Sequence, residues 1–196
     1  MKISDFIETV HPTLGAMAPW LATYNADKII KKLIENAGSD YVFEDGNAIH
    51  KSSTIEQGAV VKGPVFIGPK CLVAAGAYLR GGVWLEGDVI VGPHCEVKSS
   101  YFFSGSKVAH LSFVGDSVIG HRANIEAGAM LANYRNEKSD KTIRFYFGGK
   151  LIDTDVDKFG VVVGDGVRIG ANAVIAPGAA LLPNTIVKRL ELVDQA

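Results

Sequence analysis

The sequence predicts an all-β chain whose body is a parallel β-solenoid of six-residue repeats, preceded by a short helical segment. Three observations predict this fold. A large aliphatic or aromatic residue recurs at every sixth position over most of the chain, a small or β-branched residue follows four positions after it, and glycine is abundant, with 22 residues. A helix would repeat about every 3.6 residues and a single strand every second residue, so a period of six indicates short strands joined by tight turns.

The segment before the repeat, residues 1–48, differs in character from the rest of the chain. Asn25 or Asp27 is placed to cap a helix that ends before Gly38 and carries its apolar residues on one face. These apolar residues are Ile29, Ile30, Leu33 and Ile34. We expect the segment to form a helical cap over the open first coil, because a cap protects a strand edge from pairing with other chains.

The repeat is expected to span residues 49–188, followed by a tail over 189–196. The first inward-facing series is Ile49, Ile55, Val61, Ile67, Val73, Leu79, Leu85, Val91, Val97 and Phe103. Two later series keep the same spacing: Phe113, Ile119, Ile125 and Leu131, then Val163, Ile169, Ile175, Leu181 and Val187. Cys71 and Cys95 fall at the small inward position, so we expect them to pack in the core rather than form a disulfide.

This register breaks twice. Phe103 and Phe113 are ten residues apart instead of six, so four extra residues are expected to bulge from the wall near 106–110. Leu131 and Val163 are 32 residues apart, so roughly residues 133–160 are expected to leave the solenoid as a loop inserted between coils. Breaks in a consistent pattern are where functional residues are expected.

The six-residue pattern resembles that of the hexapeptide-repeat acyltransferases. In that superfamily three hexads make one triangular coil of 18 residues, and the coils wind in a left-handed sense. On this geometry Arg80 and Lys98, which are 18 residues apart, lie on the same face in consecutive coils, about 4.8 Å apart along the stack. A phosphate would relieve their repulsion. The alternative is two solvated surface charges, with Glu96 near enough to neutralise part of the pair.

His110 is the histidine best placed for catalysis, because it lies in the expected bulge. A neutral imidazole can remove a proton from an attacking amine, which makes His110 a candidate general base. The other histidines, His11, His50, His94 and His121, are interpreted as having no catalytic role. Asp153, Asp155 and Asp157 alternate like metal ligands, but no glycine and distal glutamate complete a calcium loop, so they are interpreted as loop charges.

A longer motif narrows the resemblance. The string SKVAHLSFVGDSVIGHRANIEAGAMLANY is similar to the acetyltransferase domain of the bifunctional UDP-N-acetylglucosamine pyrophosphorylase/glucosamine-1-phosphate N-acetyltransferase family and of its archaeal sugar-1-phosphate relatives. The resemblance covers roughly residues 49–188 and is strongest from residue 80 to residue 142. It implies that His110 is the catalytic base. It also implies a substrate site of Arg80, Lys98, Phe113 and Asn124, and an acetyl-CoA site of Ala127, Asn133, Tyr134 and Ala171.

Two positions depart from the family pattern. Phe113 stands where the bacterial enzymes have a tyrosine that contacts the sugar, and Glu126 stands where they have a glycine. The 48 residues before the repeat are too few for the nucleotidyltransferase domain of the family. We therefore expect only the acetylating reaction to be retained.

The resemblance implies an N-acetyltransferase that uses acetyl-CoA as co-substrate, needs no metal and acts on an amino-sugar-1-phosphate in nucleotide-sugar biosynthesis. The acceptor would be glucosamine-1-phosphate or galactosamine-1-phosphate, and the assembly a homotrimer. One alternative is a non-catalytic trimeric scaffold that binds a sugar nucleotide and partners a separate nucleotidyltransferase. Another is a metal enzyme like the hexapeptide-repeat carbonic anhydrases, but that chemistry needs three convergent histidines, and no such pattern is evident.

Composition limits the partners further. The net charge is −1, with 20 basic and 21 acidic residues, which argues against a nucleic-acid or anionic-membrane partner. The first ten residues lack the apolar stretch of a signal peptide, and no apolar run approaches the roughly 20 residues that span a bilayer. We therefore expect a cytoplasmic protein.

Overall fold

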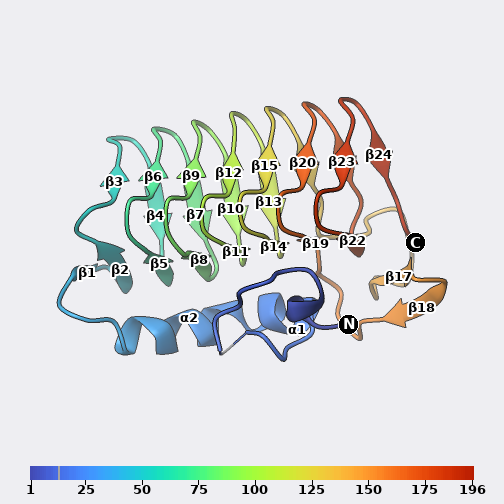
Figure 1. Cartoon of the computed structure of the whole chain (residues 1–196), viewed down its shortest axis with the longest axis horizontal. Helices are drawn as coiled ribbons and strands as arrows, with labels where there is room; N and C mark the ends of the chain where they lie inside the picture. The colour runs from blue at the N-terminus through green and yellow to red at the C-terminus, as the bar shows by residue number, and fades with distance from the viewer. Residues whose placement is uncertain (13) are drawn as a thin grey trace.

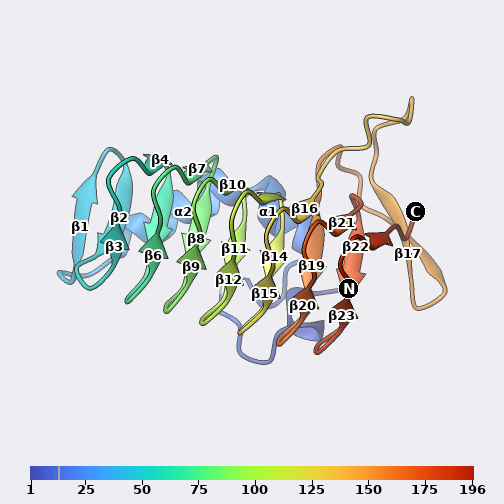
Figure 2. The same cartoon turned by 90° about the horizontal axis from the view of Figure 1, so that it is seen from above.

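The protein is described by a computed structural model that covers residues 1–12 and 14–196. Its body is a left-handed parallel β-helix, in which three parallel sheets run along one common axis (Figures 1 and 2). Among the described residues, each of these three faces contains seven parallel strands. The solenoid predicted from the six-residue period is confirmed.

The chain visits the three faces in turn. Face 1 contains β2 (Asn47–His50), β5 (Val65–Ile67), β8 (Val83–Leu85), β11 (Tyr101–Phe102), β14 (Val118–Ile119), β19 (Val161–Val163) and β22 (Ala179–Leu181). Face 2 contains β3 (Thr54–Ile55), β6 (Leu72–Val73), β9 (Ile90–Val91), β12 (Lys107–Val108), β15 (Asn124–Ile125), β20 (Arg168–Ile169) and β23 (Ile186–Val187). Face 3 contains β4 (Val60–Lys62), β7 (Tyr78–Arg80), β10 (Glu96–Lys98), β13 (Phe113–Gly115), β16 (Met130–Leu131), β21 (Val174–Ile175) and β24 (Leu192–Val193).

The interior of the prism is a continuous apolar core. One large side chain from each strand points inward and stacks on its equivalents in the coils before and after it. Cys71 and Cys95 are buried in this core as free thiols, as predicted. Burial raises the pKa of both thiols, Cys71 to about 11, so both stay protonated and behave as small apolar side chains.

The predicted register is wrong between Val97 and Ile119. Phe102, not Phe103, points into the core, and it is followed by Val108 and Val114. Two coils here are 17 residues long instead of 18, so that Val97, for example, pairs with Val114. The chain is therefore shortened at this point, and the predicted four-residue bulge at 106–110 does not exist. The reason is that Phe103 is equally buried, but on the outside of the wall, where it packs against Trp84 and His121.

The N-terminal segment lies along the outside of face 1 (Figure 1). It contains η1 (Ile3–Asp5), α1 (Pro19–Tyr24) and α2 (Ala26–Glu35), and the predicted helix from Asn25 is confirmed as α2. Its apolar side chains cover outward-facing residues of the sheet, and the Tyr101 hydroxyl donates a hydrogen bond to the Ala22 carbonyl at 3.0 Å. The expected cap over the first coil is therefore not formed by the helices. Instead, β1 (Tyr41–Glu44) pairs antiparallel with β2 and covers that edge of face 1.

The expected inserted loop leaves the prism after β16 and contains a hairpin, β17 (Arg144–Phe147) and β18 (Lys150–Asp153) (Figure 2). The inserted loop packs against the N-terminal segment, because Phe145 and Phe159 contact the ring of Trp20 edge-on. Beyond residue 188 the chain adds β24 to face 3, so the expected tail begins with one more strand. The division into 1–48, 49–188 and 189–196 stays a prediction.

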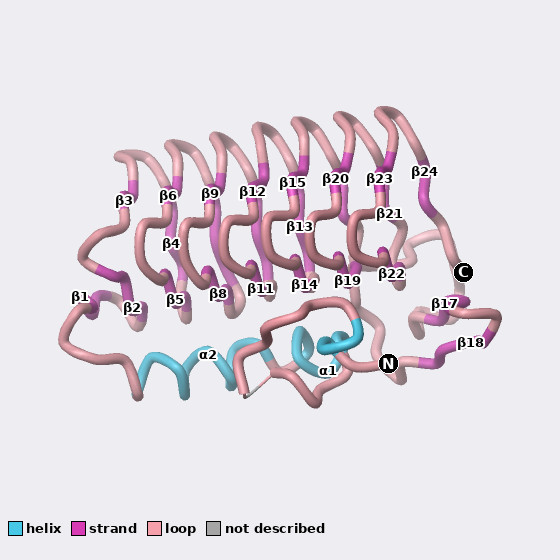
Figure 3. Tube along the Cα trace, viewed as in Figure 1, coloured by secondary structure: helices cyan, strands magenta, loops and turns pink. Residues whose placement is uncertain are grey.

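In the part of the chain that the structure describes, the last helix ends at Glu35 (Figure 3). None of these described helices has the length and apolar character that crossing a bilayer requires.

Candidate active site

Face 3 carries a ladder of basic residues close to its corner with face 1. Lys62, Arg80 and Lys98 occupy matching positions in three consecutive coils. The prediction that Arg80 and Lys98 lie on one face in adjacent coils is thereby confirmed. The next position of the ladder is Gly115, where a Cβ would lie 2.7 Å from the Asn133 amide nitrogen. Glycine at this position lets the start of the inserted loop approach the wall.

Each of the two predicted phosphate ligands already has a carboxylate partner. Arg80 is paired with Glu96, with Nη2 2.6 Å from Oε1. Lys98 is paired with Asp116 at 2.8 Å, and the two side chains are 18% and 6% exposed. The repulsion expected between neighbouring cations is therefore relieved within the chain. A bound anion would have to compete with these carboxylates, most strongly at Lys98, where water is largely excluded.

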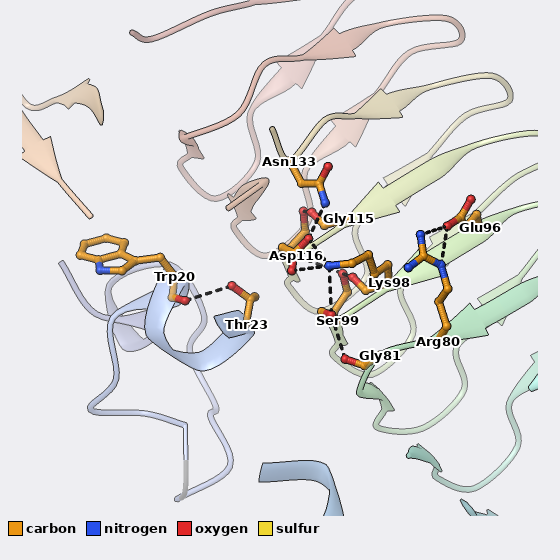
Figure 4. A network of polar contacts seen from close by, with 12 residues as sticks. Trp20, Thr23, Arg80, Gly81, Glu96, Lys98, Ser99, Gly115, Asp116 and Asn133 are labelled. Atoms are coloured by element: carbon orange, nitrogen blue, oxygen red, sulfur yellow. Dashed lines mark hydrogen bonds and ion pairs between the residues drawn. The ribbon is translucent and has the colours of Figure 1, made fainter. Parts of the chain in front are cut away.

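Asp116 joins three parts of this region (Figure 4). It lies in the turn after β13 with a φ of 45° and accepts hydrogen bonds from Lys98 Nζ and from the Asn133 amide. Its carbonyl accepts a bond from Gly160 N–H at 2.9 Å. Because Asn133 begins the inserted loop and Gly160 ends it, Asp116 ties both ends of the loop to the basic ladder.

These groups line a hollow of about 450 Å³ on the outside of face 3. Its lining residues are Arg80, Lys98, Phe113, Asn133, Tyr134, Asp157 and Lys158. The hollow therefore brings together three predicted substrate residues and two predicted acetyl-CoA residues. Asp157 and Lys158, which also line the hollow, were not predicted as site residues. Their only signal is that they belong to the segment that breaks the repeat.

His110 lies at the corner between faces 2 and 3, in an ordinary turn rather than in a bulge. Gly128 N–H donates to the His110 carbonyl, and Asn172 N–H donates to the Ala127 carbonyl. His110, Ala127 and Ala171 thus occupy equivalent positions in three successive coils. The His110 side chain is exposed at this corner and does not line the hollow, although Phe113, three residues later, does.

Asn124 lies on the other side of this corner. It lines a second hollow, of about 460 Å³, on face 2, together with Glu126, Arg168 and Arg189. The predicted substrate residues are therefore divided between two faces that meet at the corner of His110. One copy of the chain does not enclose them in a single cavity.

Glu126 changes the chemistry of this corner. Its carboxylate accepts a hydrogen bond from Ala171 N–H at 2.9 Å and is paired with Arg189 at 2.9 Å. The bond from Arg189 is the main reason why the pKa of Glu126 is lowered, followed by the bond from Ala171. Ala171 is one of the positions that the resemblance assigns to acetyl-CoA, and its backbone N–H is thus occupied by a side chain that the family pattern lacks.

Two acidic residues of the inserted loop, Asp140 and Asp153, are paired with one arginine of the same loop. Arg144 bonds to Asp140 at 2.6 Å and to Asp153 at 2.7 Å, which closes the base of the hairpin. In residues 1–12 and 14–196, no group of three or more histidine, cysteine, aspartate or glutamate side chains is arranged to hold a metal ion.

Comparison with known proteins places the chain in a family. The family model described as the GMPPB C-terminal domain matches residues 61–196. The chain belongs to this family. Its curated relatives include a bifunctional sugar-1-phosphate nucleotidylyltransferase/acetyltransferase from Sulfurisphaera tokodaii, 36% identical over 158 residues, which cover 74% of this chain and 39% of the relative. The bifunctional protein GlmU from Methanococcus vannielii is 32% identical over 130 residues, which cover 66% of this chain and 29% of that protein. This chain thus spans well under half the length of these two relatives.

One solved structure supports the fold of this chain, and a second is similar over most of its length. A mutant of AntD, an N-acyltransferase from Bacillus cereus in complex with dTDP and coenzyme A, superposes with a TM-score of 0.51 at 13% identity, covering 69% of this chain and 76% of that one. The acetyltransferase domain of PglB from Neisseria gonorrhoeae, in complex with acetyl coenzyme A, gives a TM-score of 0.46 at 18% identity, covering 91% and 78%.

Proposed function

We propose that the chain is an acetyl-CoA-dependent N-acetyltransferase acting on an amino-sugar-1-phosphate, with glucosamine-1-phosphate or galactosamine-1-phosphate as the acceptor. The observation that carries the proposal is the hollow on face 3, which unites Arg80, Lys98 and Phe113 with Asn133 and Tyr134. The Sulfurisphaera tokodaii relative, whose name includes an acetyltransferase, supports the same reaction class.

In the proposed mechanism the sugar amine attacks the thioester carbonyl of acetyl-CoA. His110 removes a proton from the amine, the new C–N bond forms and the C–S bond breaks. Coenzyme A leaves as a thiolate, which takes up the proton from His110 to become the thiol. A backbone N–H at the same corner would stabilise the oxyanion, a contribution of about 3 kcal/mol. Arg80 and Lys98 would hold the phosphate in exchange for Glu96 and Asp116, and so fix the amine against the thioester.

We further propose a homotrimer in which His110 acts on a cofactor held by a neighbouring subunit. The division of the predicted residues between faces 2 and 3 supports this arrangement, because a second copy could complete the site. Several apolar side chains along face 3 and its corner are exposed to water in the single chain, which is typical of an interface. They include Leu111, Met130, Val174, Leu190 and Leu192.

The test of this function is thiol release from acetyl-CoA with each acceptor. Turnover with glucosamine-1-phosphate or galactosamine-1-phosphate would support the proposal and indicate the acceptor. Absence of turnover with both acceptors, together with no binding of acetyl-CoA in calorimetry, would overturn it.

The second candidate is a non-catalytic trimeric scaffold that binds a sugar nucleotide and partners a separate nucleotidyltransferase. Glu126 favours this reading, because it occupies the Ala171 N–H and adds charge at the corner where the cofactor would lie. Binding of a sugar nucleotide without binding of acetyl-CoA would favour the scaffold over the enzyme.

A further inference from the structure

Arg135 is a buried cation directly after Tyr134, one of the two residues that the resemblance assigns to acetyl-CoA. Its side chain is 3% exposed. It forms a forked pair with Asp194, with Nη2 2.7 Å from Oδ1 and Nη1 3.0 Å from Oδ2, and Nη2 also donates to the Pro177 carbonyl at 2.7 Å. Planar two-point pairs of this kind fix orientation as well as charge. Arg135 is therefore held in one position by the residue that follows β24.

The segment that carries Asp194 is itself anchored. The Gln195 side chain accepts a hydrogen bond from Ala180 N–H at 2.9 Å and donates one to the Ala180 carbonyl at 3.2 Å. The Gln195 carbonyl accepts a bond from Tyr146 N–H of the inserted hairpin. Asp194 thus approaches Arg135 from a segment fixed to face 1 and to the hairpin.

The turn that contains Arg135 is also held from its other side. Lys141 Nζ donates to the carbonyls of Arg135, at 3.1 Å, and Asn136, at 2.9 Å. The same ammonium group lies 5.1 Å from the centre of the Tyr134 ring. At the start of the turn, Asn133 is bound to Asp116. Of the side chains that hold this turn, Asp194 is the most distant in sequence, 59 residues from Arg135.

We propose that Asp194 is a positioning residue for the acetyl-CoA side of the candidate site: through Arg135 it fixes the turn that presents Asn133 and Tyr134 to the hollow. The inference rests on the proposed function in so far as that function assigns these two residues to acetyl-CoA. Removing the Asp194 charge leaves the buried guanidinium without its main counter-ion, and the turn should then open locally more often.

The experiment compares Asp194→Asn with Glu137→Gln. Glu137 is a matched control, because it also contacts the Arg135 guanidinium, at 3.4 Å, but is 61% exposed. Two readouts are taken: amide hydrogen exchange over residues 133–142, and the separate kinetic constants for acetyl-CoA and for the sugar phosphate.

For Asp194→Asn we expect exchange over 133–142 to accelerate by about tenfold or more, with exchange in β5 and β8 unchanged. The KM for acetyl-CoA should rise by about tenfold, whereas kcat at saturating acetyl-CoA should change by less than about threefold. Glu137→Gln should match the wild type. If Asp194 had a purely structural role, Asp194→Asn would instead lower the stability of the whole chain and change all kinetic constants together.

Gln195→Ala is the second variant, in case Asp194→Asn does not fold. It loosens the segment that carries Asp194 without leaving a buried charge unpaired. It should therefore accelerate exchange over 133–142 and raise the KM for acetyl-CoA, each by a smaller factor than Asp194→Asn. Exchange at 133–142 that is unchanged in the folded variants would overturn the proposal. If the wild type neither turns over nor binds acetyl-CoA, the proposed function and the assignment of this turn to acetyl-CoA fail together, while exchange alone still decides whether Asp194 holds the turn.

Discussion

The Glu126 carboxylate accepts hydrogen bonds from Ala171 N–H and from Arg189 at the corner where His110 and Ala127 also lie. Because the pKa of Glu126 is lowered, chiefly by the hydrogen bond from Arg189, the carboxylate protonates at a lower pH than an ordinary glutamate. Its hydrogen bonds are thus kept while the carboxylate is ionised and are lost only as the pH falls through the lowered pKa. Mild acidification does not free the Ala171 N–H, so a substitution is needed to test what this donor can bind.

We expect Glu126→Ala to tighten acetyl-CoA binding by about 2- to 10-fold, the value of one added neutral hydrogen bond. The matched control is Glu56→Ala. Glu56 makes the equivalent bond to Ala75 N–H, at 2.8 Å, at the same corner near the other end of the prism. Calorimetric titration of both variants with acetyl-CoA measures the effect. Equal affinities in both variants and the wild type would show that Ala171 N–H does not contact the cofactor.

The pairing of charges in the site was less predictable than the stacking of residues. The 18-residue spacing placed Arg80 and Lys98 correctly, because pairing between coils follows directly from the repeat. Nothing in the spacing indicated that Asp116 would turn back onto Lys98, or that Arg189 would reach Glu126 from 63 residues away. Such contacts depend on side-chain conformation and on the exact length of each turn, neither of which a period reveals.

At the scale of elements, the docking of the N-terminal helices on face 1 explains the wrong register at Phe102 and Phe103. In an uncovered solenoid the outward residue of a strand is solvated, and alternation identifies the inward one. Here the outward residues Trp84, Tyr101 and Phe103 are also buried, beneath the N-terminal segment. Two adjacent phenylalanines are then equally good candidates for the core, and a coil shortened by one residue goes unnoticed.

The Tyr101 hydroxyl tests this docking, because it is fully buried and bonds to the Ala22 carbonyl of α1. Tyr101→Phe should lower the free energy of unfolding by about 1 kcal/mol. For a chain of this size, this corresponds to a Tm that is lower by about 2–4 °C. Tyr24→Phe is the control, because Tyr24 lies in the same helix but is 64% exposed. Thermal unfolding followed by circular dichroism gives both values. A Tyr101→Phe variant as stable as Tyr24→Phe would contradict the docked arrangement.

In the molecule as a whole, the corner between faces 2 and 3 carries apolar side chains that the rest of the described chain leaves exposed. Leu111 is 68% exposed and Leu190 is 79% exposed. Both have positive φ, 58° and 62°, a conformation that favours glycine or asparagine. Leucine at these positions is unfavourable for the isolated chain, because its side chain is exposed to water and its backbone has a positive φ. Burial of these side chains against another copy of the chain would compensate for this cost.

Leu111→Asn should therefore leave the folded chain at least as stable, while weakening the proposed trimer. The molar mass from light scattering should fall from about three chains toward the 20.9 kDa of one. Leu151→Asn is the control, because Leu151 lies on the hairpin, away from this corner, and is 55% exposed. A Leu111→Asn protein with the same mass as the control would exclude this corner from the interface.

Acetyl transfer with His110 as the base is best tested by the rate of thiol release by His110→Ala beside His94→Ala. His94 is also an exposed histidine in a turn of this corner, one coil earlier, so it controls for the loss of an imidazole. We expect His110→Ala to lower kcat by about 10²–10⁴-fold, while His94→Ala stays near the wild-type rate. A His110→Ala enzyme that retains close to the wild-type rate at its optimal pH would show that His110 is not the base.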